Sequence, residues 1–284
     1  MTETATVAPA EHFVDLKKYR VHYWEAGAGH PVILLHGGGP GATGMTNYSQ
    51  NIGPLAGQFH VFALDMPGWG DSDTPTEPSG YDHAAILVEF LDALRIDRAA
   101  LVGNSMGGLT SVATATFHPD RVSHLITMGA PAPFPYILSP HGPSEGIKVL
   151  AQAYRETTAA NMKRLVQVMV YDSSFATDEL AEARARAALT RPEHLKAWVR
   201  RSEQNVSGVL THFSLGAQIQ NITAPTLIIQ GFDDRVVPYE SALHLVASIP
   251  DSRVVLLNHC GHWAQIEHAD EFNRVVASFI SAGA

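Results

Sequence analysis

The chain has 284 residues, 45% of them hydrophobic, which suits one large globular domain or a domain with an insertion. The 19 Lys and Arg residues against 28 Asp and Glu residues give a formal net charge of −9, and no basic run occurs. Nucleic acid and anionic membranes are therefore not expected partners, and a small molecule is. Residues 1–11 lack the basic start and apolar core of a signal peptide, and no apolar run approaches the roughly 18 residues of a membrane span. The expected location is the cytoplasm.

Short apolar runs rich in β-branched residues alternate with helical patterns along most of the chain. Residues 13–25 predict a hairpin, and six later runs predict buried strands with apolar neighbours on both faces, as a parallel sheet requires. Residues 81–94 and 106–117 predict helices between strands. The fold class is therefore α/β, a mainly parallel sheet with helices on both faces. The six strand runs are residues 32–36, 61–65, 99–105, 124–130, 226–231 and 253–259.

The alternation breaks once, because no strand pattern occurs from Pro131 to about Gly216. Apolar residues there recur at helical spacing, and Thr177 followed by two acidic residues predicts a helix start. We therefore predict an inserted helical lid at residues 133–215, between core segments 1–132 and 216–284. Some of its apolar side chains are expected to line a substrate pocket: Met162, Leu165, Met169, Phe175 and Phe213.

One serine is surrounded by glycines where a predicted strand meets a predicted helix. The segment at residues 103–107 reads Gly-Asn-Ser-Met-Gly, the G-x-S-x-G pattern of a nucleophile at a sharp strand-to-helix turn. Side chains two positions on either side of Ser105 would collide with neighbouring backbone, which explains Gly103 and Gly107. A plain strand–helix turn is the alternative, but the flanking elements favour a catalytic Ser105.

A serine nucleophile needs a base to accept its proton and a carboxylate to orient that base, in the chain order Ser, acid, His for this fold. Two predicted strands downstream of Ser105 end in such residues, at the sheet edge where α/β proteins build sites. We predict Asp234 as the acid and His262 as the base. The rivals, Asp233 and His259, are assigned to loop stabilisation and to the strand end.

The glycine-rich loop at residues 36–44, HGGGPGATG, follows a predicted strand. Its spacing fits neither phosphate-binding pattern. In an α/β hydrolase such a loop supplies one N–H of the oxyanion hole, and the residue after the nucleophile supplies the other. Gly38 and Met106 are the predicted backbone donors.

Four segments together resemble the α/β-hydrolase superfamily and, within it, the meta-cleavage product hydrolases, which cut a carbon–carbon bond in ring-opened aromatic catabolites. In that family a 2-hydroxy or 2-oxo acid is held by loop glycines, the asparagine before the nucleophile, the tryptophan after the histidine and a lid arginine. The match implies Gly38, Gly39, Asn104, Trp263 and Arg184, with Arg186 and Arg191 as nearby alternatives for the arginine. The segments are HGGGPGA (36–42), GNSMGG (103–108), GFDDRVVP (231–238) and CGHWAQIEHADEFN (260–273).

The resemblance implies a hydrolase that needs no cofactor or metal and turns a 2-hydroxy-6-oxo-dienoate into a 2-hydroxydienoate and a carboxylic acid. Either Ser105 or a water activated by His262 could attack the distal ketone. Val236 and Gln230 stand where family members often carry an aromatic residue and a tryptophan, so the apolar end of the pocket is expected to differ. A homo-oligomer, a dimer or larger, is also expected.

Two other functions are compatible with the same residues. A carboxylesterase or lactonase could use the same three residues, and a ligand receptor could use the scaffold without catalysis, although intact Ser105, Asp234 and His262 argue against a receptor. Haloalkane dehalogenases and epoxide hydrolases need a carboxylate at position 105 and are excluded. The single cysteine, Cys260, excludes an intrachain disulfide and a cysteine-rich metal site, and is predicted to be a small buried hydrophobe.

Overall fold

The computed structural model describes residues 8–75, 82–139, 142–203 and 212–282, except for the side chains of residues 212 and 213. Eight strands in this part form one sheet in the order β1-β2-β4-β3-β5-β6-β7-β8. β1 and β2 pair antiparallel, as does β2 with β4, and all other pairs are parallel. The strands are β1 Ala10–Asp15, β2 Arg20–Gly27, β3 Pro31–Leu35, β4 His60–Leu64, β5 Ala99–Asn104, β6 Val122–Met128, β7 Thr226–Gly231 and β8 Ser252–Leu257.

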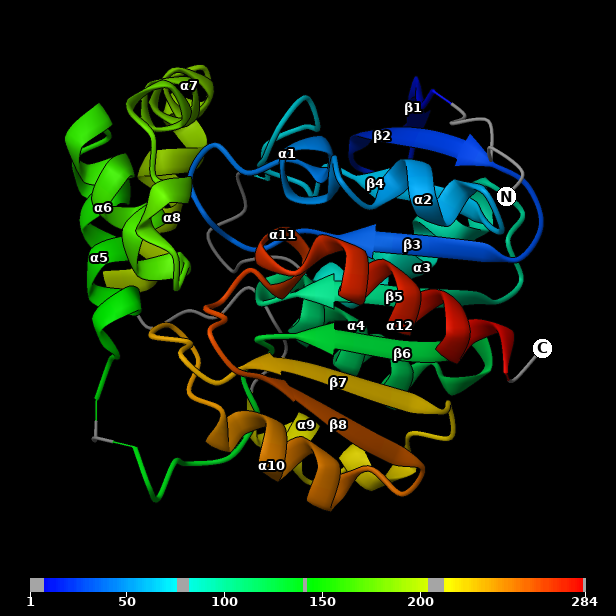
Figure 1. Cartoon of the computed structure of the whole chain (residues 1–284). Coiled ribbons are helices and arrows are strands. Elements are labelled where there is room, and N and C mark those ends of the chain that lie inside the picture. Colours follow the sequence, from blue (N-terminus) through cyan, green and yellow to red (C-terminus); the bar gives the residue numbers. More distant parts are fainter. Residues whose placement is uncertain (1–7, 76–81, 140–141, 204–211, 283–284) are drawn as a thin grey trace, which may run out of the picture.

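Helices cover both faces of the sheet, and a further group of helices lies beyond the strand ends (Figure 1). Between β6 and β7 every described regular element is helical. The helices are α1 Gly44–Tyr48, α2 Ile52–Ala56, α3 His83–Ala93, α4 Met106–Phe117, α5 Glu145–Arg155, α6 Ala159–Met169, α7 Asp178–Leu189, α8 Pro192–Glu203, α9 His212–Gly216, α10 Glu240–Ser248, α11 Ala264–Glu267 and α12 Ala269–Ser281, with short 3-10 turns at Pro119–Arg121, Ser173–Phe175 and Ile219–Asn221.

The predicted fold class is confirmed, and the reason is visible in the strands. Consecutive residues of β3 enter different cores: Ile33 and Leu35 join one apolar cluster, and Val32 and Leu34 join another. Because both faces are covered, these strands must be apolar at every position. The first residue of the predicted helix 81–94 lies outside the described residues, and α3 begins at His83.

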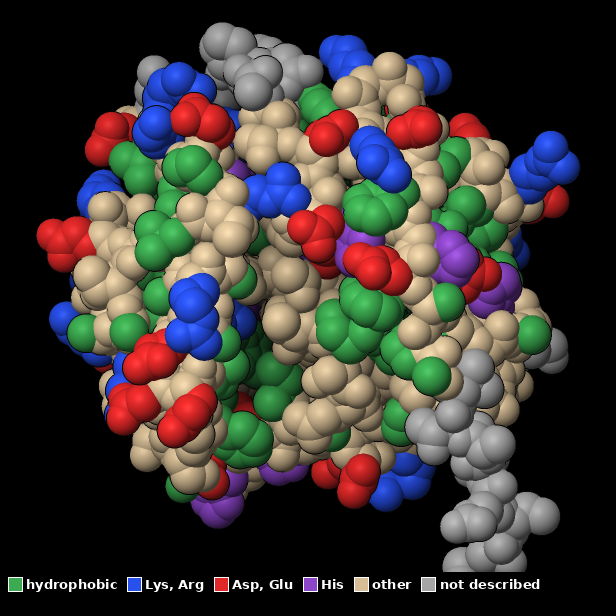
Figure 2. All heavy atoms as spheres, turned by 90° about the horizontal axis from the view of Figure 1, so that it is seen from above, with side chains coloured by type: hydrophobic (Ala, Val, Ile, Leu, Met, Phe, Trp, Pro, Cys, Tyr) green, Lys and Arg blue, Asp and Glu red, His purple; other side chains and the backbone are tan. Residues whose placement is uncertain are grey.

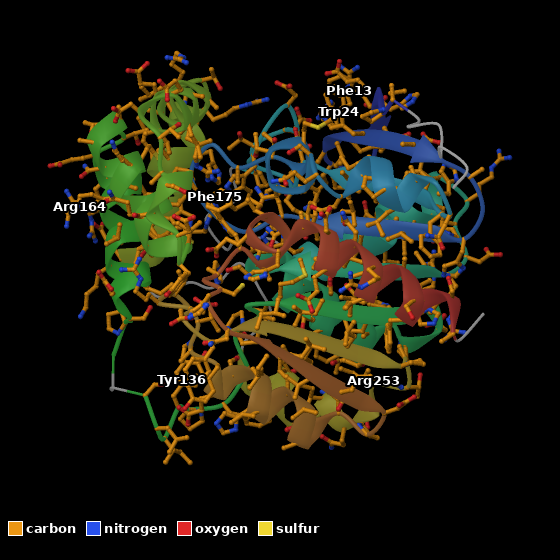
Figure 3. All side chains as sticks on the ribbon, in the orientation of Figure 1. Phe13, Trp24, Tyr136, Arg164, Phe175 and Arg253 are labelled. Carbon is orange, nitrogen blue, oxygen red and sulfur yellow. The ribbon has the colours of Figure 1, made fainter. Side chains whose placement is uncertain are left out.

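The helices α5 to α8 form a block with a core of its own, which we call the helical block. Met162, Leu165 and Met169 are buried in it together with Val236 and Trp263 from the strand-end loops. Thr177 caps α7 by accepting from the Leu180 N–H, as its sequence pattern predicts. In Figure 3 the labelled Arg164 points away from the sheet. The helical block therefore packs directly over the carboxyl ends of the parallel strands, toward which their arrowheads point in Figure 1.

The outer surface carries charges of both signs. On the face shown in Figure 2, acidic and basic side chains are interspersed among apolar ones. Within the described part of the chain, no helix combines the length and apolar character that a membrane crossing requires. Cys260 is fully buried, as predicted.

Candidate active site

A cavity of about 440 Å³ lies between the carboxyl ends of the strands and the helical block. Eight of the nine predicted site residues line it, and the ninth, Asp234, has a fully buried side chain behind His262. The eight are Gly38, Gly39, Asn104, Ser105, Met106, Arg184, His262 and Trp263.

The backbone turns sharply at Ser105, between β5 and α4. Ser105 has φ 53° and ψ −112°, a conformation rare for a residue with a side chain. Its N–H donates to the Met128 carbonyl at 2.8 Å, and its carbonyl accepts the Leu109 N–H at 2.9 Å. A Cβ at Gly103 would lie 2.3 Å from the Gly107 oxygen, and one at Gly107 would lie 2.1 Å from the Leu35 oxygen. The two glycines therefore permit the backbone contacts that the turn requires.

His262 and Asp234 form a buried pair. His262 Nδ1 lies 2.7 Å from Asp234 Oδ2, and both side chains are at most 2% exposed. The other carboxylate oxygen accepts the backbone N–H groups of Val236 at 2.8 Å and Val237 at 2.9 Å. These donors hold the carboxylate in place, so the imidazole is oriented from behind while its far edge faces the cavity.

The rival residues make different contacts. Asp233 accepts the backbone N–H of Cys260 at 3.4 Å and does not line the cavity. His259 is exposed, has φ 53°, and stacks on Tyr171 with ring centroids 4.9 Å apart. Asp233 therefore stabilises a loop, and His259 lies just after the end of β8.

Gln230 is a site residue whose contact the sequence did not reveal. It is buried at 1% exposure, and its Nε2 donates to Asp234 Oδ2 at 3.0 Å. Family members often carry a tryptophan at this position. In this chain the glutamine there contacts the carboxylate of Asp234 and does not line the cavity. Val236, the other departure, does line the cavity.

The peptide planes of the glycine-rich loop are fixed by hydrogen bonds. The buried His36 accepts the Met66 N–H on Nε2 at 2.9 Å, so the proton lies on Nδ1, which donates to the Gly37 carbonyl at 2.8 Å. Burial lowers the pKa of His36, which keeps this ring neutral. Since the Gly38 N–H is trans to the Gly37 carbonyl, its direction is set as well. His36 stood in the quoted motif, but no role was predicted for it.

Gly38 lies close to the start of α4. A Cβ at Gly38 would lie 3.3 Å from Met106 Sδ, so the loop and the helix start are in contact. The first intrahelical acceptor of α4 is the Ser105 carbonyl, which leaves the Met106 N–H without an intrahelical partner. The Gly38 carbonyl accepts from the Tyr154 hydroxyl at 2.7 Å, which ties the loop to the helical block.

Arg184 extends from α7 into the cavity wall and is 6% exposed. Its guanidinium lies 5.2 Å from the Trp263 ring centre, and Nη2 donates to the Pro40 carbonyl at 3.3 Å. Within the described residues, Nε has no hydrogen-bond partner. Burial lowers the pKa of Arg184 to about 10, so the group is still cationic at neutral pH.

The neighbouring arginines are directed elsewhere. Arg186 is exposed and pairs with Glu182 at 3.3 Å, and Arg191 pairs with Asp71 at 3.3 Å. Neither lines the cavity. Of the three arginines considered from the sequence, the structure brings only Arg184 to the site.

The side-chain amide of Asn104 is oriented by two hydrogen bonds. Its Nδ2 already donates to the His262 carbonyl at 3.1 Å and the Met128 carbonyl at 3.3 Å. Its buried Oδ1 has no partner among the described residues. Asn104 therefore presents an acceptor, suited to a substrate hydroxyl. Asn47, from α1, also lines the cavity and was not predicted.

The remaining walls of the cavity differ in character. One wall is apolar and comes from α5, α6 and the loop after β7: Ile147, Leu150, Met169 and Val236. A second set comes from α3, α4, α8 and a loop after β4: Trp69, His83, Leu109, Trp198, Arg201 and Ser202.

The lid residues predicted to line the pocket separate into two groups. Met169 reaches the cavity, whereas Met162 and Leu165 belong to the core of the helical block. Phe175 packs against the same core and lies on the side facing the sheet in Figure 3. The side chain of Phe213 lies outside the described residues.

A sheet with this strand order, a serine at the turn after β5 and an Asp–His pair at later strand ends is the architecture of an α/β hydrolase. A family model described as the alpha/beta hydrolase fold matches residues 31–269.

Relatives and solved structures narrow the family further. A 2-hydroxy-6-oxononadienedioate/2-hydroxy-6-oxononatrienedioate hydrolase of Cupriavidus pinatubonensis is 41% identical over 286 residues, 98% of each chain. A 2-hydroxy-6-oxo-6-phenylhexa-2,4-dienoate hydrolase of Burkholderia cepacia is 41% identical over 271 residues, 94% of this chain and 93% of that one. A solved meta-cleavage product hydrolase from Pseudomonas fluorescens IP01 is 31% identical, with a TM-score of 0.84 over 96% of this chain and 98% of that one. The chain belongs to the α/β-hydrolase family and, within it, to the meta-cleavage product hydrolases, which confirms the resemblance.

Proposed function

We propose that this chain hydrolyses the carbon–carbon bond next to the 6-oxo group of 2-hydroxy-6-oxo-dienoates, the class of compound named for its relatives. The products are a 2-hydroxydienoate and a carboxylic acid. The observation that carries the proposal is Arg184, a buried cation in the cavity wall whose Nε has no partner within the described residues. A planar guanidinium suits the carboxylate of a dienoate, whereas a simple ester has no such group to offer.

The reaction begins with a proton shift in the substrate from the 2-hydroxyl to C5, which gives a 2,6-dioxo form. Ser105 Oγ then attacks C6 while His262 Nε2 accepts the hydroxyl proton and Asp234 stabilises the imidazolium. The N–H groups of Gly38 and Met106 donate to the oxyanion that forms on the C6 oxygen. Their fixed directions make these donors available without reorganisation.

The C5–C6 bond breaks when the tetrahedral intermediate collapses. The bonding electrons pass to C5 and spread through the conjugated system to the 2-oxo group, beside the carboxylate held by Arg184. His262 returns its proton to this dienolate, which leaves as the 2-hydroxydienoate. Arg184 therefore interacts more strongly as charge develops, which is the requirement for catalysis.

Water then hydrolyses the acyl group on Ser105. His262 takes one proton from the water and delivers it to Ser105 Oγ, and the carboxylic acid leaves. The alternative is direct attack by a water activated through His262, with no covalent intermediate. Rapid mixing of the enzyme with substrate in ¹⁸O-labelled water, followed by mass analysis of the protein, tests whether an acyl group on Ser105 accumulates.

The rival function is a carboxylesterase or lactonase that uses the same three residues. The test offers the purified enzyme a panel of yellow dienoates beside nitrophenyl esters and follows the loss of dienolate colour. Cleavage of dienoates with a kcat/KM well above that for esters supports the proposal. An enzyme that hydrolyses esters and ignores dienoates contradicts it.

The helical block is proposed to act as a lid over this site, since it supplies Arg184 and Met169 to the cavity. A homo-oligomer in the cytoplasm, with no nucleic acid partner, is proposed as well. A chain with one buried cysteine suits a reducing compartment. Light scattering of the purified protein and fractionation of the source cells test these two points.

A further inference from the structure

Successive carbonyl groups of the glycine-rich loop, at residues 37–40, each accept a hydrogen bond from a side chain. Glycine has the most conformational freedom of any residue, so a loop of glycines needs such donors to keep its peptide planes fixed. The donor and acceptor pairs are His36 Nδ1 with Gly37 at 2.8 Å, the Tyr154 hydroxyl with Gly38 at 2.7 Å, Trp69 Nε1 with Gly39 at 2.9 Å and Arg184 Nη2 with Pro40 at 3.3 Å.

Tyr154 differs from the other three donors in its position. His36 is part of the loop, and Trp69 and Arg184 line the cavity, whereas Tyr154 does not. Tyr154 lies on α5, is 2% exposed and stacks on Trp198, with ring centroids 3.9 Å apart and ring planes 4° from parallel. The stacked ring holds the hydroxyl in place, and the hydroxyl can act on a substrate only through the loop.

The hydrogen bond from Tyr154 to the Gly38 carbonyl also directs the next N–H. Since this peptide is trans, the Gly39 N–H points opposite to the Gly38 carbonyl. Within the described residues, the Gly39 N–H has no hydrogen-bond partner, and Gly39 lines the cavity. A Cβ at Gly39 would lie 3.1 Å from Arg184 Nη2, so Gly39 lies against the guanidinium. The N–H and the guanidinium are therefore placed to bind one anionic group.

We propose that Tyr154 is a positioning residue, which holds the Gly39 N–H toward the acid end of the substrate. The inference rests on the proposed function, in which Arg184 holds the carboxylate at that end. When the C5–C6 bond breaks, negative charge spreads to the 2-oxo group, so a donor already directed there binds more strongly in the transition state. Without the hydroxyl, the peptide between Gly38 and Gly39 is free to rotate, and this donor is lost.

The experiment replaces Tyr154 with phenylalanine, which removes only the hydroxyl and keeps the ring that stacks on Trp198. Rates are measured with a dienoate and with a small nitrophenyl ester on the same preparations. The kcat/KM for the dienoate should fall about 10- to 100-fold, mainly through kcat, as expected for one hydrogen bond to a charged group. The ester rate should change little, because a simple ester has no acid end.

Tyr171→Phe is the matched control, since Tyr171 is exposed and does not line the cavity. It should keep both rates. Binding of 2-oxopentanoate gives a second measure that needs no turnover. In the wild type its addition should shift the amide proton resonance of Gly39 downfield, which requires no variant. Calorimetry should show that Tyr154→Phe binds 2-oxopentanoate about tenfold more weakly than the wild type does.

The outcomes separate this proposal from the proposed function. Equal losses on the dienoate and the ester in Tyr154→Phe would show a structural tyrosine and overturn the positioning role, and so would an unchanged dienoate rate. An unshifted Gly39 resonance would overturn the role of its N–H. Each of these results leaves the carbon–carbon hydrolase intact. A wild type that ignores dienoates overturns the proposed function, and the 2-oxopentanoate measurements then decide the role of Tyr154 alone.

Discussion

The replacement Arg184→Gln tests the chemistry of the site most directly. The side chain is 6% exposed and, with a pKa of about 10, still cationic at pH 7. Removing one partner of a buried, hydrogen-bonded charge pair costs about 2–5 kcal/mol, mainly through the charge left unpaired. We therefore expect kcat/KM for a dienoate to fall roughly 30- to 4,000-fold, at 1.4 kcal/mol for each factor of ten. Glutamine keeps much of the packing volume, so the fold should persist.

The assay follows dienolate colour with a dienoate and nitrophenolate release with a small ester, on the same enzyme preparations. The ester rate should change little, because an ester presents no carboxylate to position 184. Arg186→Gln and Arg191→Gln are the controls, since their side chains pair with Glu182 and Asp71 outside the cavity. Equal losses on both substrates would show that Arg184 is structural. No loss on the dienoate would contradict a carboxylate-binding role for Arg184 and point to another cation.

Four further predictions concern the catalytic residues, the cavity wall and pH. Ser105→Ala should lower turnover at least about 10³-fold while substrate still binds, and a variant that keeps a tenth of the wild-type rate would contradict its role as nucleophile. Asp234→Asn should lower kcat by about 10⁴-fold, and a larger loss in Asp233→Asn would show that the wrong carboxylate was chosen. Met169→Trp should change which acyl groups are accepted without altering the pH profile, and unchanged selectivity would show that Met169 only packs in the helical block. Burial, aided by the charge of Arg201, lowers the pKa of His194 to about 3 in the folded state, so as pH falls below 6.5 only the unfolded state takes up its proton. The free energy of unfolding should drop by about 2 kcal/mol for this residue between pH 7 and pH 5, and urea melts of His194→Gln that show the same drop as the wild type would disprove the assignment.

The parts of the fold that were predicted are those encoded locally. A strand of a covered parallel sheet must be apolar at nearly every position, so β3, β5 and β7 are visible in the sequence as short apolar runs. The turn at Ser105 is visible because backbone contacts as close as those of Gly103 and Gly107 admit no other residue. The five-residue helices α1 and α2 were not predicted, because five residues are too few for a periodic pattern.

The parts that were missed are side-chain contacts that form only when loops fold back or when separate segments meet. Gln230 is four residues from Asp234 and looks like an interior strand residue until the loop folds back and brings Nε2 to the carboxylate. His36 reaches Met66, thirty positions away, and so directs the loop peptide beside it. Helical spacing likewise identified the apolar residues of α6, but not that Met169 faces the cavity while Leu165 faces the core of the helical block.

Arg200 and Arg201 show that adjacent residues of one helix can differ in exposure in a way that the sequence does not reveal. Adjacent helical residues point about 100° apart, so one arginine of α8 lies in solvent and the other lines the cavity, although both look like solvated charges in the sequence. The catalytic groups lie at the strand ends, where the sheet places them together. The helical block adds a further part of the cavity wall. Two relatives with the same 41% identity carry names with a dioate and a phenyl substrate, so overall identity does not distinguish the acyl group. The side chains that line the cavity away from the catalytic residues are where that distinction can be made.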